Sequence, residues 1–477
     1  MAVSVETLTG DTVTFSDEEI GELRRSFRGP LIGPRDEAYD DVRVVHNGMF
    51  DRHPGLIFQC SGPADVIDAV TLAREHDLLT SIRGGGHHVA GHSVHDDALM
   101  IDLSQMNAVW VDPRERVVRV QGGATWADVD RETQAHGLVV PGGVVSTTGV
   151  AGLTLGGGIG WLHRKWGLTC DNLRAAELVT ADGELIRASE EENPDLFWGL
   201  KGGGGNFGVV TAFEFDAHPL GPMVACAPVF YDPDDAEEIL SAWRDWSANV
   251  PDEVTSRFIL WWLPEHPALP PEVHDREVLV LAATYAGPPD EGEQVLQPIR
   301  EFGEPLVDLS GRMPFRMFNS MMDPLFPKGE VASYWKSIYL QDLTDEALEV
   351  IIERARSRSS PRTLIHVPMM GGAAGRVGAT DTAFGDRSAP YMISVDGNWL
   401  DREQSDRHIA WVRDTIEEAR TLPGGGGIYL NFSGDHAPDD AEMDAAYGEN
   451  LERLAEVKKT YDPDNFFRLN NNIEPAD

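Results

Sequence analysis

Six runs of adjacent glycines interrupt this chain of 477 residues, at 84–86, 122–123, 142–143, 156–158, 202–205 and 424–427. A glycine has no Cβ atom, so its backbone can adopt positive φ and can approach a ligand closely. Successive backbone amides in such loops form concave sites for anions. A tight turn between strands explains any single run. Five runs within the first 205 residues instead predict that this region binds a large ligand with a pyrophosphate.

The first 220 residues show many short elements rather than a long regular alternation of strands and helices. Such a pattern predicts an α+β fold and argues against a doubly wound sheet. The dipeptide Asp182-Gly183 separates two strand-like runs and predicts a hairpin. Apolar residues at helical spacing between 66 and 73 predict a helix that starts near Pro63. Further strands are predicted at 56–58, 79–82 and 209–215, and a helix at 126–136.

One glycine run contains a formal G-x-G-x-x-G match, formed by Gly203, Gly205 and Gly208. A dinucleotide-binding fingerprint needs a strand before this motif and a helix after it. Here the strand-like run VVTAFEF follows the glycines. The sequence therefore does not predict a Rossmann site at this match.

The composition changes near residue 221. Strand-like runs such as VLVLAATYAG and YMISVDGNW then alternate with acidic helical segments such as SDRHIAWVRDTIEEAR. This pattern predicts a second α+β domain at 221–440, built on an antiparallel sheet. A last helix is expected to end at Asp462-Pro463, and the segment 441–477 is expected to return to the first domain, which spans 1–220 with its core at about 50–220.

The net charge is −40, with 79 acidic and 39 basic residues, and only six of the basic residues are lysines. So negative a protein repels nucleic acid and anionic membranes. The N-terminus lacks the features of a signal peptide, and no apolar run reaches about 18 residues. Three separated cysteines, Cys60, Cys170 and Cys226, fit a reducing compartment. We expect a cytoplasmic protein from a high-salt organism, with an ordinary acidic protein as the alternative; the oligomeric state is left open.

The segment RGGGHHVAGHS at 83–93 holds three histidines beside a glycine run. His88 and His92 stand four residues apart, but they lie in a predicted loop, and no pattern of Cys, Asp or Glu completes a metal site. The segment resembles the R-x-G-G-H signature of FAD-linked oxidases of the vanillyl-alcohol oxidase superfamily, in the berberine-bridge-enzyme-like branch. The resemblance implies that His87 carries the flavin 8α-methyl group covalently.

Four further segments carry the same resemblance, in the same order along the chain. Residues 140–184 resemble the second flavin-binding stretch of the family, and 193–215 the end of its FAD domain. Residues 428–435 contain its Y-x-N motif, and 461–473 resemble its C-terminal tail. Members with a second covalent link carry a Cys where this chain has Val145, so a single link through His87 is expected. The resemblance implies a two-part FAD-binding domain of the PCMH type and a substrate domain.

The resemblance also implies site residues. Tyr429 of the Y-x-N motif is the implied catalytic base, provided that a cation or a second phenol lowers its pKa from about 10. Arg387 and Tyr391 are further catalytic candidates, and Arg376 and His366 lie in the same region. Arg83 could support the phosphates or form a structural ion pair. The implied cofactor-binding residues are Arg83, Gly84, Gly85, Gly86, His87, His88, Gly91, His92, Ser93, Gly143, Val144, Thr147, Thr148, Gly149, Gly152, Gly157, Gly158, Gly160, Trp161, Val209, Tyr429, Asn431 and Asn472.

These features lead to a functional expectation. We expect an enzyme that transfers a hydride from a small alcohol, sugar or amine to covalently bound FAD, with O2 as the acceptor and H2O2 as the product. Thr148 falls where the family controls the access of oxygen, and its modest size favours an oxidase. A flavin dehydrogenase with another acceptor is the alternative. A metal-binding protein without enzymatic activity, in which the glycines form only turns, is a third possibility.

Overall fold

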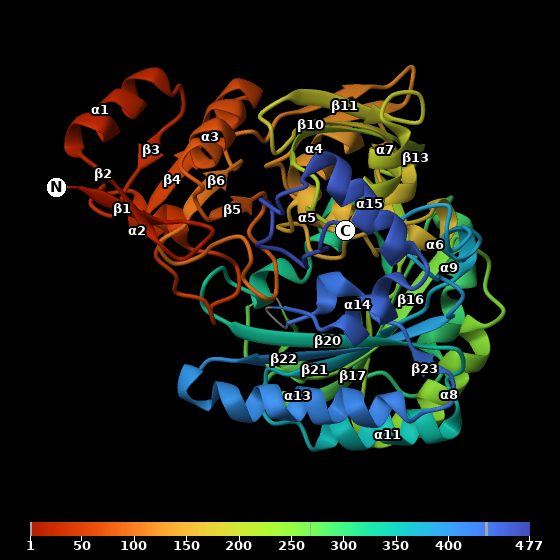
Figure 1. Ribbon diagram of the computed structural model, residues 1–477. Helices are drawn as coiled ribbons and strands as arrows, with labels where there is room; N and C mark the ends of the chain where they lie inside the picture. Colours follow the sequence, from red (N-terminus) through yellow and green to blue (C-terminus); the bar gives the residue numbers. More distant parts are fainter. Residues whose placement is uncertain (1, 268, 435–436) are drawn as a thin grey trace.

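The computed structural model describes residues 2–267, 269–434 and 437–477. The chain starts with a hairpin and a capped helix that lead into a small four-stranded sheet at one end of the molecule (Figure 1). Its strands run in the order β3-β4-β6-β5, and β4 and β5 are both parallel to β6. These elements are β1 (Val3–Glu6), β2 (Thr12–Phe15), α1 (Asp17–Ser26), β3 (Leu31–Ile32), β4 (Leu56–Gln59), α3 (Pro63–Glu75), β5 (Thr80–Arg83) and β6 (Leu99–Asp102).

The predicted helix after Gly62 is confirmed as α3, which has Pro63 in its first turn, where a missing N–H costs nothing. Val66, Ala69, Val70 and Ala73 of α3 are fully buried and pack in one core with the small sheet. The strand that follows, β5, ends at Arg83. The glycine run 84–86 follows directly after this edge strand. The packing of the sheet therefore determines where the run begins.

A second, five-stranded sheet is entirely antiparallel and has the order β11-β10-β12-β8-β7. The hairpin predicted at Asp182-Gly183 is confirmed, because Val179 pairs with Leu185. The C-terminal helices α14 and α15 share a core with this sheet, since Tyr447 and Leu454 pack in one cluster with Phe213. The elements are β7 (Val109–Asp112), β8 (Val117–Gln121), α4 (Trp126–Gln134), α5 (Val150–Leu155), β10 (Leu173–Val179), β11 (Leu185–Ser189), α7 (Pro194–Leu200), β12 (Val209–Asp216), α14 (Asp440–Tyr447) and α15 (Asn450–Tyr461).

Residues between 223 and 426 build a large antiparallel sheet, as the alternating pattern of this region predicts. Its main path runs β18-β15-β17-β16-β21-β22-β20-β23, with β14 beside β17 and β19 beside β14. The strands are β14 (Met223–Cys226), β15 (Val229–Tyr231), β16 (Val254–Leu263), β17 (Arg276–Tyr285), β18 (Val307–Asp308), β19 (Gly311–Pro314), β20 (Ala332–Leu340), β21 (Leu364–Pro368), β22 (Tyr391–Trp399) and β23 (Gly425–Gly426).

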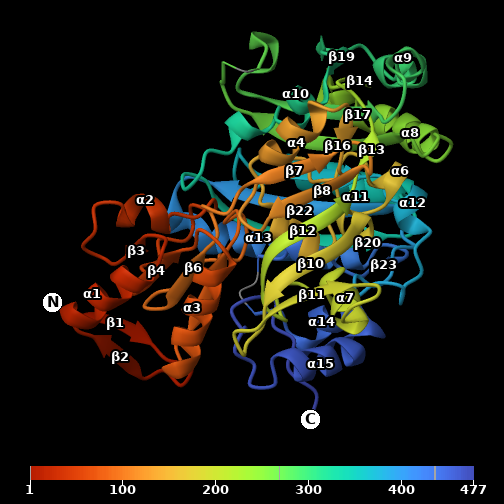
Figure 2. The same ribbon diagram turned by 90° about the horizontal axis from the view of Figure 1, so that it is seen from above.

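Three helices cover one face of this large sheet: α8 (Ala236–Ser247), α11 (Asp345–Arg356) and α13 (Ser405–Arg420). In Figure 1 they lie below the sheet, and the two smaller sheets lie above it; Figure 2 shows the small N-terminal sheet at the side of the molecule. Successive side chains of a strand point to opposite faces. In β16, Phe258 and Leu260 accordingly pack with the helices. Arg257, Ile259 and Trp261 point to the other face, toward the glycine-rich loops.

The overall architecture is a mixed α+β fold. The cysteines Cys60, Cys170 and Cys226 are free and buried. No helix within 2–267, 269–434 and 437–477 is long and apolar enough to cross a membrane.

Candidate active site

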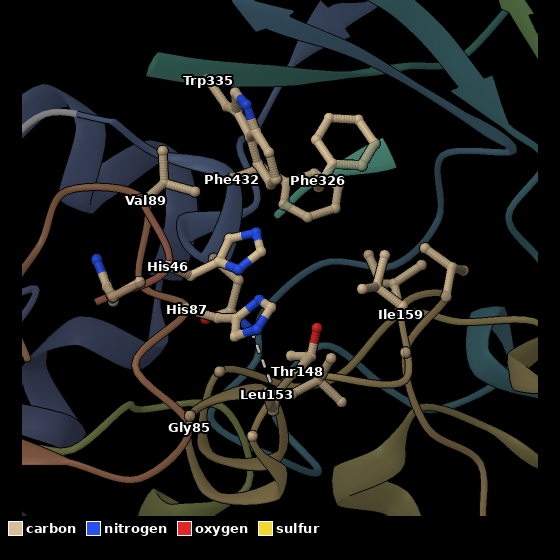
Figure 3. A pocket seen from close by; sticks show the side chains of 18 of the residues that line it. His46, Gly85, His87, Val89, Thr148, Leu153, Ile159, Phe326, Trp335 and Phe432 are labelled. Carbon is tan, nitrogen blue, oxygen red and sulfur yellow. Dashed lines mark hydrogen bonds between the residues drawn. The ribbon is translucent and has the colours of Figure 1, made fainter. Parts of the chain in front are cut away.

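A cavity of about 840 Å³ lies between the glycine-rich loops and the uncovered face of the large sheet. This volume is in the upper part of the range for small-molecule sites, about 300–1,000 Å³. Figure 3 shows Thr148, Leu153 and Ile159 on one side of it and the aromatic rings of Phe326, Trp335 and Phe432 across from them. One half of the lining is therefore glycine-rich backbone, and the other half is side chains of the sheet.

The glycine-rich half brings together runs that are far apart in the sequence. Gly84 to Gly86, Gly149, Gly152, Gly156 and four glycines between 202 and 208 all line the cavity. The loop at Gly85 touches the loop at Gly149 so closely that a Cβ on Gly85 would lie 2.4 Å from the Cα of Gly149. A side chain at either position would separate the two loops. The residue type at these positions is thus determined by a backbone-to-backbone contact.

His87 lies at the wall of the cavity, with its ring stacked on the ring of His46 at a centroid distance of 3.8 Å and an angle of 15° (Figure 3). Burial lowers the pKa of His87 well below its usual 6.5, and nearby His46 and Lys328 lower it further. Its ring also makes a hydrogen bond with the backbone of Thr147. His87 is therefore a neutral imidazole with one ring position occupied by a hydrogen bond.

The other histidines of this loop also face the cavity. His88 and His92 both line it, with ring centroids 4.4 Å apart, and the His88 Nδ1 atom accepts a hydrogen bond from the Ala90 amide at 3.2 Å. The Ser93 hydroxyl is buried and has no hydrogen-bond partner among the described residues. The part of the chain that the structure describes contains no group of three or more His, Cys, Asp or Glu residues arranged to hold a metal ion.

Arg83 does not reach the cavity, which contradicts its expected role at the phosphates. Its guanidinium forms two hydrogen bonds with the buried carboxylate of Asp102, at 2.9 and 2.6 Å. Asp102 lies on the neighbouring strand, directly beside Arg83, because the two residues are register partners in the parallel pair β5–β6. The structure thus selects the structural ion pair that the sequence left open.

Several other implied cofactor residues also lie outside the cavity lining, and most of them are glycines that serve packing. A Cβ on Gly91 would meet the ring of Phe50 at 2.5 Å. Asn472 donates instead to the carboxylate of Glu474 at 3.0 Å, and its neighbours Asn470 and Asn471 take the place at the cavity. The implied residues outside the lining are Arg83, Gly91, Thr147, Gly157, Gly158, Gly160 and Asn472.

Tyr429 lines the cavity, but its surroundings do not activate it as a base. Its hydroxyl accepts hydrogen bonds from the side chain of Asn431 at 2.9 Å and from the amide of Ile159 at 3.4 Å. Burial raises the pKa of Tyr429 to about 12, although these two hydrogen bonds act in the opposite direction. The expected lowering of this pKa is therefore contradicted, and Tyr429 is suited to hydrogen bonding.

The two other catalytic candidates lie away from the cavity. Tyr391 opens β22 and points to the helix-covered face, where its hydroxyl bonds with Ser247 at 3.0 Å. Arg387 forms an ion pair with Asp171 at 2.7 Å and donates to Thr382 at 2.6 Å. Neither side chain reaches the cavity, for different reasons: the strand turns Tyr391 to the helices, and Arg387, in the loop before β22, is held by its contacts with Asp171 and Thr382. Arg376, at the surface, pairs with Asp252.

The cavity face of the sheet carries a polar cluster that was not predicted from the sequence. The His366 Nε2 atom lies 3.4 Å from Asp396 Oδ2, and Ser394 donates to the other carboxylate oxygen at 2.5 Å. His366 Nδ1 is buried without a hydrogen-bond partner among the described residues. Arg257 stacks on the ring of Trp161, with 4.6 Å between its Cζ atom and the ring centroid. All three charged or titratable groups line the cavity.

The sequence does hold a signal for this cluster. In YMISVDGNW, Tyr391, Ile393 and Val395 alternate with Met392, Ser394 and Asp396. The first three pack with the helices, so the second set lies on the opposite face of the sheet, where Asp396 lines the cavity. The register places Asp396 opposite Leu364 and Ser394 opposite His366, which brings the polar groups of β21 and β22 together. Alternation could have identified Asp396, but only the strand register pairs it with His366.

The residues present fit an FAD cofactor. Glycine loops give close backbone access, as a pyrophosphate requires. The Ser93 Oγ, Asn470 Oδ1 and Asn471 Oδ1 atoms are buried without partners in the described chain, and all three residues line the glycine-rich half. Buried polar atoms nearly always have partners in a native protein. A polar ligand in this half of the cavity would provide them.

Comparison with known proteins agrees with this fit. Residues 54–189 match the model of the FAD binding domain, and residues 429–474 match the family described as berberine and berberine like. An uncharacterised FAD-linked oxidoreductase of Bacillus subtilis is 32% identical over 464 residues, which is 94% of this chain and 97% of that protein.

Solved structures share the fold over 94–96% of the chain. The 6-hydroxy-D-nicotine oxidase of Arthrobacter nicotinovorans superimposes with a TM-score of 0.84 at 25% identity, covering 94% of this chain and 98% of that one. The carbohydrate oxidase of Microdochium nivale gives a TM-score of 0.79 at 22% identity, covering 96% and 100%. Together with the fit of the cavity, these matches show that the chain belongs to the FAD-linked oxidoreductases of the berberine-bridge-enzyme-like family, whose FAD-binding domain is of the PCMH type.

Proposed function

We propose that this enzyme oxidises an alcohol, sugar or amine carbon of a small molecule and passes the electrons to O2, forming H2O2. Its solved relatives include a nicotine oxidase and a carbohydrate oxidase, which support this reaction class. We also propose that residues 221–440 form the substrate-binding domain. The uncovered face of the large sheet supports this division, because it supplies the side-chain half of the cavity.

The bound FAD supplies the hydride acceptor, and the protein positions and tunes it. The glycine loops at 84–86 and 149–156 would hold its phosphates, together with Ser93. We propose that a ring nitrogen of His87 is bonded to the flavin 8α-methyl carbon. A lowered pKa supports this link, because only a neutral imidazole offers a lone pair for the bond. Because Val145 stands in place of a cysteine, no thiol is available there for a second covalent link.

The observation that carries the proposed reaction is the pair formed by His366 and Asp396. The carboxylate beside Nε2 favours the tautomer that has its proton on this nitrogen. The lone pair is then on Nδ1, which is buried without a protein partner in the described chain, and the His366 side chain lines the cavity. His366 is thus placed to take the proton from the substrate hydroxyl or amine as the hydride leaves.

Arg257 supports the same step from the neighbouring strand. Burial lowers the pKa of its guanidinium to about 10, which still leaves it charged at neutral pH. Its Nε atom is buried without a hydrogen-bond partner among the described residues. A donor with a positive charge stabilises the negative charge that develops on a substrate oxygen during deprotonation.

The choice of acceptor rests on Thr148, whose side chain lines the cavity beside Gly149. Its modest size leaves room for O2. The test uses holoenzyme in molar KCl, photoreduced without air and then mixed with oxygenated buffer in a stopped-flow instrument. We expect fast return of the visible flavin band and one H2O2 for each flavin. The matched variant Thr148→Leu should slow the reoxidation at least tenfold.

Two results would contradict this assignment. Reoxidation that is equally slow in the wild type and in Thr148→Leu, without H2O2, would identify a dehydrogenase that uses another acceptor. A purified protein without any visible flavin band would contradict flavin chemistry altogether.

A further inference from the structure

Apart from the polar cluster of Arg257, His366 and Asp396, the half of the cavity at the large sheet is lined mainly by hydrocarbon. Phe230, Ile259, Trp261, Leu364, Met322 and Phe326 bound this part, which we call the apolar chamber. Building on the proposed function, we infer that the substrate is a neutral, largely apolar aromatic alcohol and that sugars are poor substrates. This inference narrows the substrate class for the same site.

The sheet register creates the wall of the apolar chamber. Ile259 stands opposite Val280 on one side and His366 on the other, and Phe230 stands opposite Val280 on the next strand. Residues that are opposite each other in antiparallel strands share a face. Four strands, β15, β17, β16 and β21, therefore present one continuous apolar surface that ends at the polar cluster of His366 and Asp396.

A second wall is the segment 315–326, which contains α10 (Phe315–Asn319). The ring of Phe326 stacks on Trp261, with centroids 5.7 Å apart and planes 11° from parallel. Met317, Met321 and Met322 also line the cavity. Methionine is flexible and polarisable, and it adapts to aromatic surfaces. This composition is suited to a planar, apolar ligand.

The segment 315–326 is fixed to the FAD-binding part of the molecule at two points. The amide and hydroxyl of Ser146 donate to the carboxylate of Asp323, at 3.0 and 2.5 Å. Asn319 donates to the buried Asp130 at 2.8 Å. The wall is therefore held in place by the fold, and the apolar chamber has a defined shape.

Polar side chains are scarce in the apolar chamber. Among the described residues of its lining, they are the cluster of Arg257, His366 and Asp396 at one end, with Ser310 and Ser320, and the Ser320 hydroxyl is already bonded to the carbonyl of Met317. A sugar carries many hydroxyl groups, and burial of a hydroxyl without a partner costs several times the energy of a typical hydrogen bond. The polar cluster is sufficient for one reacting hydroxyl group.

The charges favour a neutral substrate. The carboxylate of Asp396 interacts electrostatically with the guanidinium of Arg257, so these two charges offset each other. An ammonium group on the substrate would be buried close to Arg257 without a carboxylate of its own. Transfer of an unpaired charge into such a site is unfavourable.

The experiment compares two probes on the holoenzyme in molar KCl. Anaerobic bleaching of the flavin is measured with 2-naphthalenemethanol and with cellobiose. Binding without reaction is measured from the flavin difference spectrum with 2-methoxynaphthalene, which has no hydroxyl group. We expect bleaching and binding with the aromatic probes at concentrations at which cellobiose has no effect.

A variant pair localises the binding. Phe326→Ser removes a partly exposed ring of the apolar chamber and should raise the Kd of 2-methoxynaphthalene at least tenfold, about 1.4 kcal/mol. Trp110→Ser removes an exposed ring of β7 outside the cavity and should leave the Kd unchanged. If Phe326→Ser does not fold, Met322→Ser serves the same purpose.

The outcomes separate this inference from the proposed function. Bleaching by cellobiose without binding of either aromatic compound would overturn the inference and leave the proposed oxidation intact. Binding of 2-methoxynaphthalene that depends on Phe326, without bleaching by any probe, would support the apolar chamber and count against the reaction. An equal Kd in the wild type and in Phe326→Ser would overturn the inference.

Discussion

The imidazole of His87 lies face to face with the imidazole of His46, with 3.8 Å between their centroids. Burial lowers the pKa of both rings, that of His46 to about 4, so the stack is neutral at physiological pH. The stack and the hydrogen bond to Thr147 hold the ring of His87 in one orientation. His88, the next residue, instead turns its Nδ1 atom back to its own loop.

The first prediction follows from this difference. In His87→Ala the flavin should no longer be attached, whereas the matched variant His88→Ala should retain the link. Each protein is denatured in acid, separated on a gel and viewed under ultraviolet light. A fluorescent band in His87→Ala, or its loss in His88→Ala alone, would contradict the assignment.

The second prediction concerns the proton acceptor. His366→Gln should lower kcat by about 10²–10⁴, because a positioned general base contributes this factor. Asp396→Asn should lower kcat as well, because it removes the carboxylate beside His366 Nε2. Tyr429→Phe should cost less than tenfold, since its raised pKa keeps the phenol protonated. A larger loss in Tyr429→Phe than in His366→Gln would restore the tyrosine as the base.

The third prediction distinguishes a structural role of Arg83 from a role in binding the cofactor. Removal of one partner of a buried ion pair costs about 3–5 kcal/mol. Arg83→Met should therefore lower the free energy of unfolding by this amount and leave Asp102 without its partner. The matched variant Arg24→Met breaks an exposed pair with Asp36 and should cost about 1 kcal/mol or less. Loss of FAD at unchanged stability would show that Arg83 binds the cofactor after all.

The fourth prediction concerns the pH dependence of stability. Burial raises the pKa of Asp130 from 3.8 to about 7, although the hydrogen bond from Asn319 opposes this shift. The folded state therefore binds this proton more tightly than the unfolded state. The resulting stabilisation is complete below about pH 4 and is lost as the pH rises through 7. It amounts to about 4 kcal/mol at most, at about 1.4 kcal/mol per pKa unit.

Urea unfolding of wild type and Asp130→Asn at about pH 5 and about pH 8 tests this sign. The stability of the variant relative to the wild type should rise between the two pH values. A constant difference would contradict the raised pKa of Asp130.

The fifth prediction follows from the charge of −40. Of the acidic residues in the described chain, only Asp65, Asp102, Asp130, Asp396 and Asp462 are buried. We propose that the protein works in a salt-rich cytoplasm, where screening relieves the repulsion between the exposed carboxylates. The Debye length falls from about 10 Å at 0.1 M to about 3 Å at 1 M salt. The free energy of unfolding should therefore rise between 0.1 M and 1 M KCl, and equal values would refute the proposal.

Local signals in the sequence were sufficient for most elements and for the family. Pro63 and the helical spacing after it located α3, and Asp182-Gly183 located the hairpin between β10 and β11. The glycine runs and the histidine of the loop at 83–93 predicted the flavin site, because each of these signals is contained within one short segment of the chain. The order of these segments along the chain was equally visible.

Tertiary structure decided every question about the direction of a side chain. Arg83 and Arg387 became ion-pair residues because Asp102 and Asp171 come close to them only in the folded chain. Tyr391 turned away from the cavity, and Asp396, five residues later, turned toward it, because the parity of a strand determines the face and the register determines the partner. The sequence by itself thus determined which cofactor the chain binds. The pairing of its strands decided which residues face the substrate, since register is a long-range property that no local pattern contains.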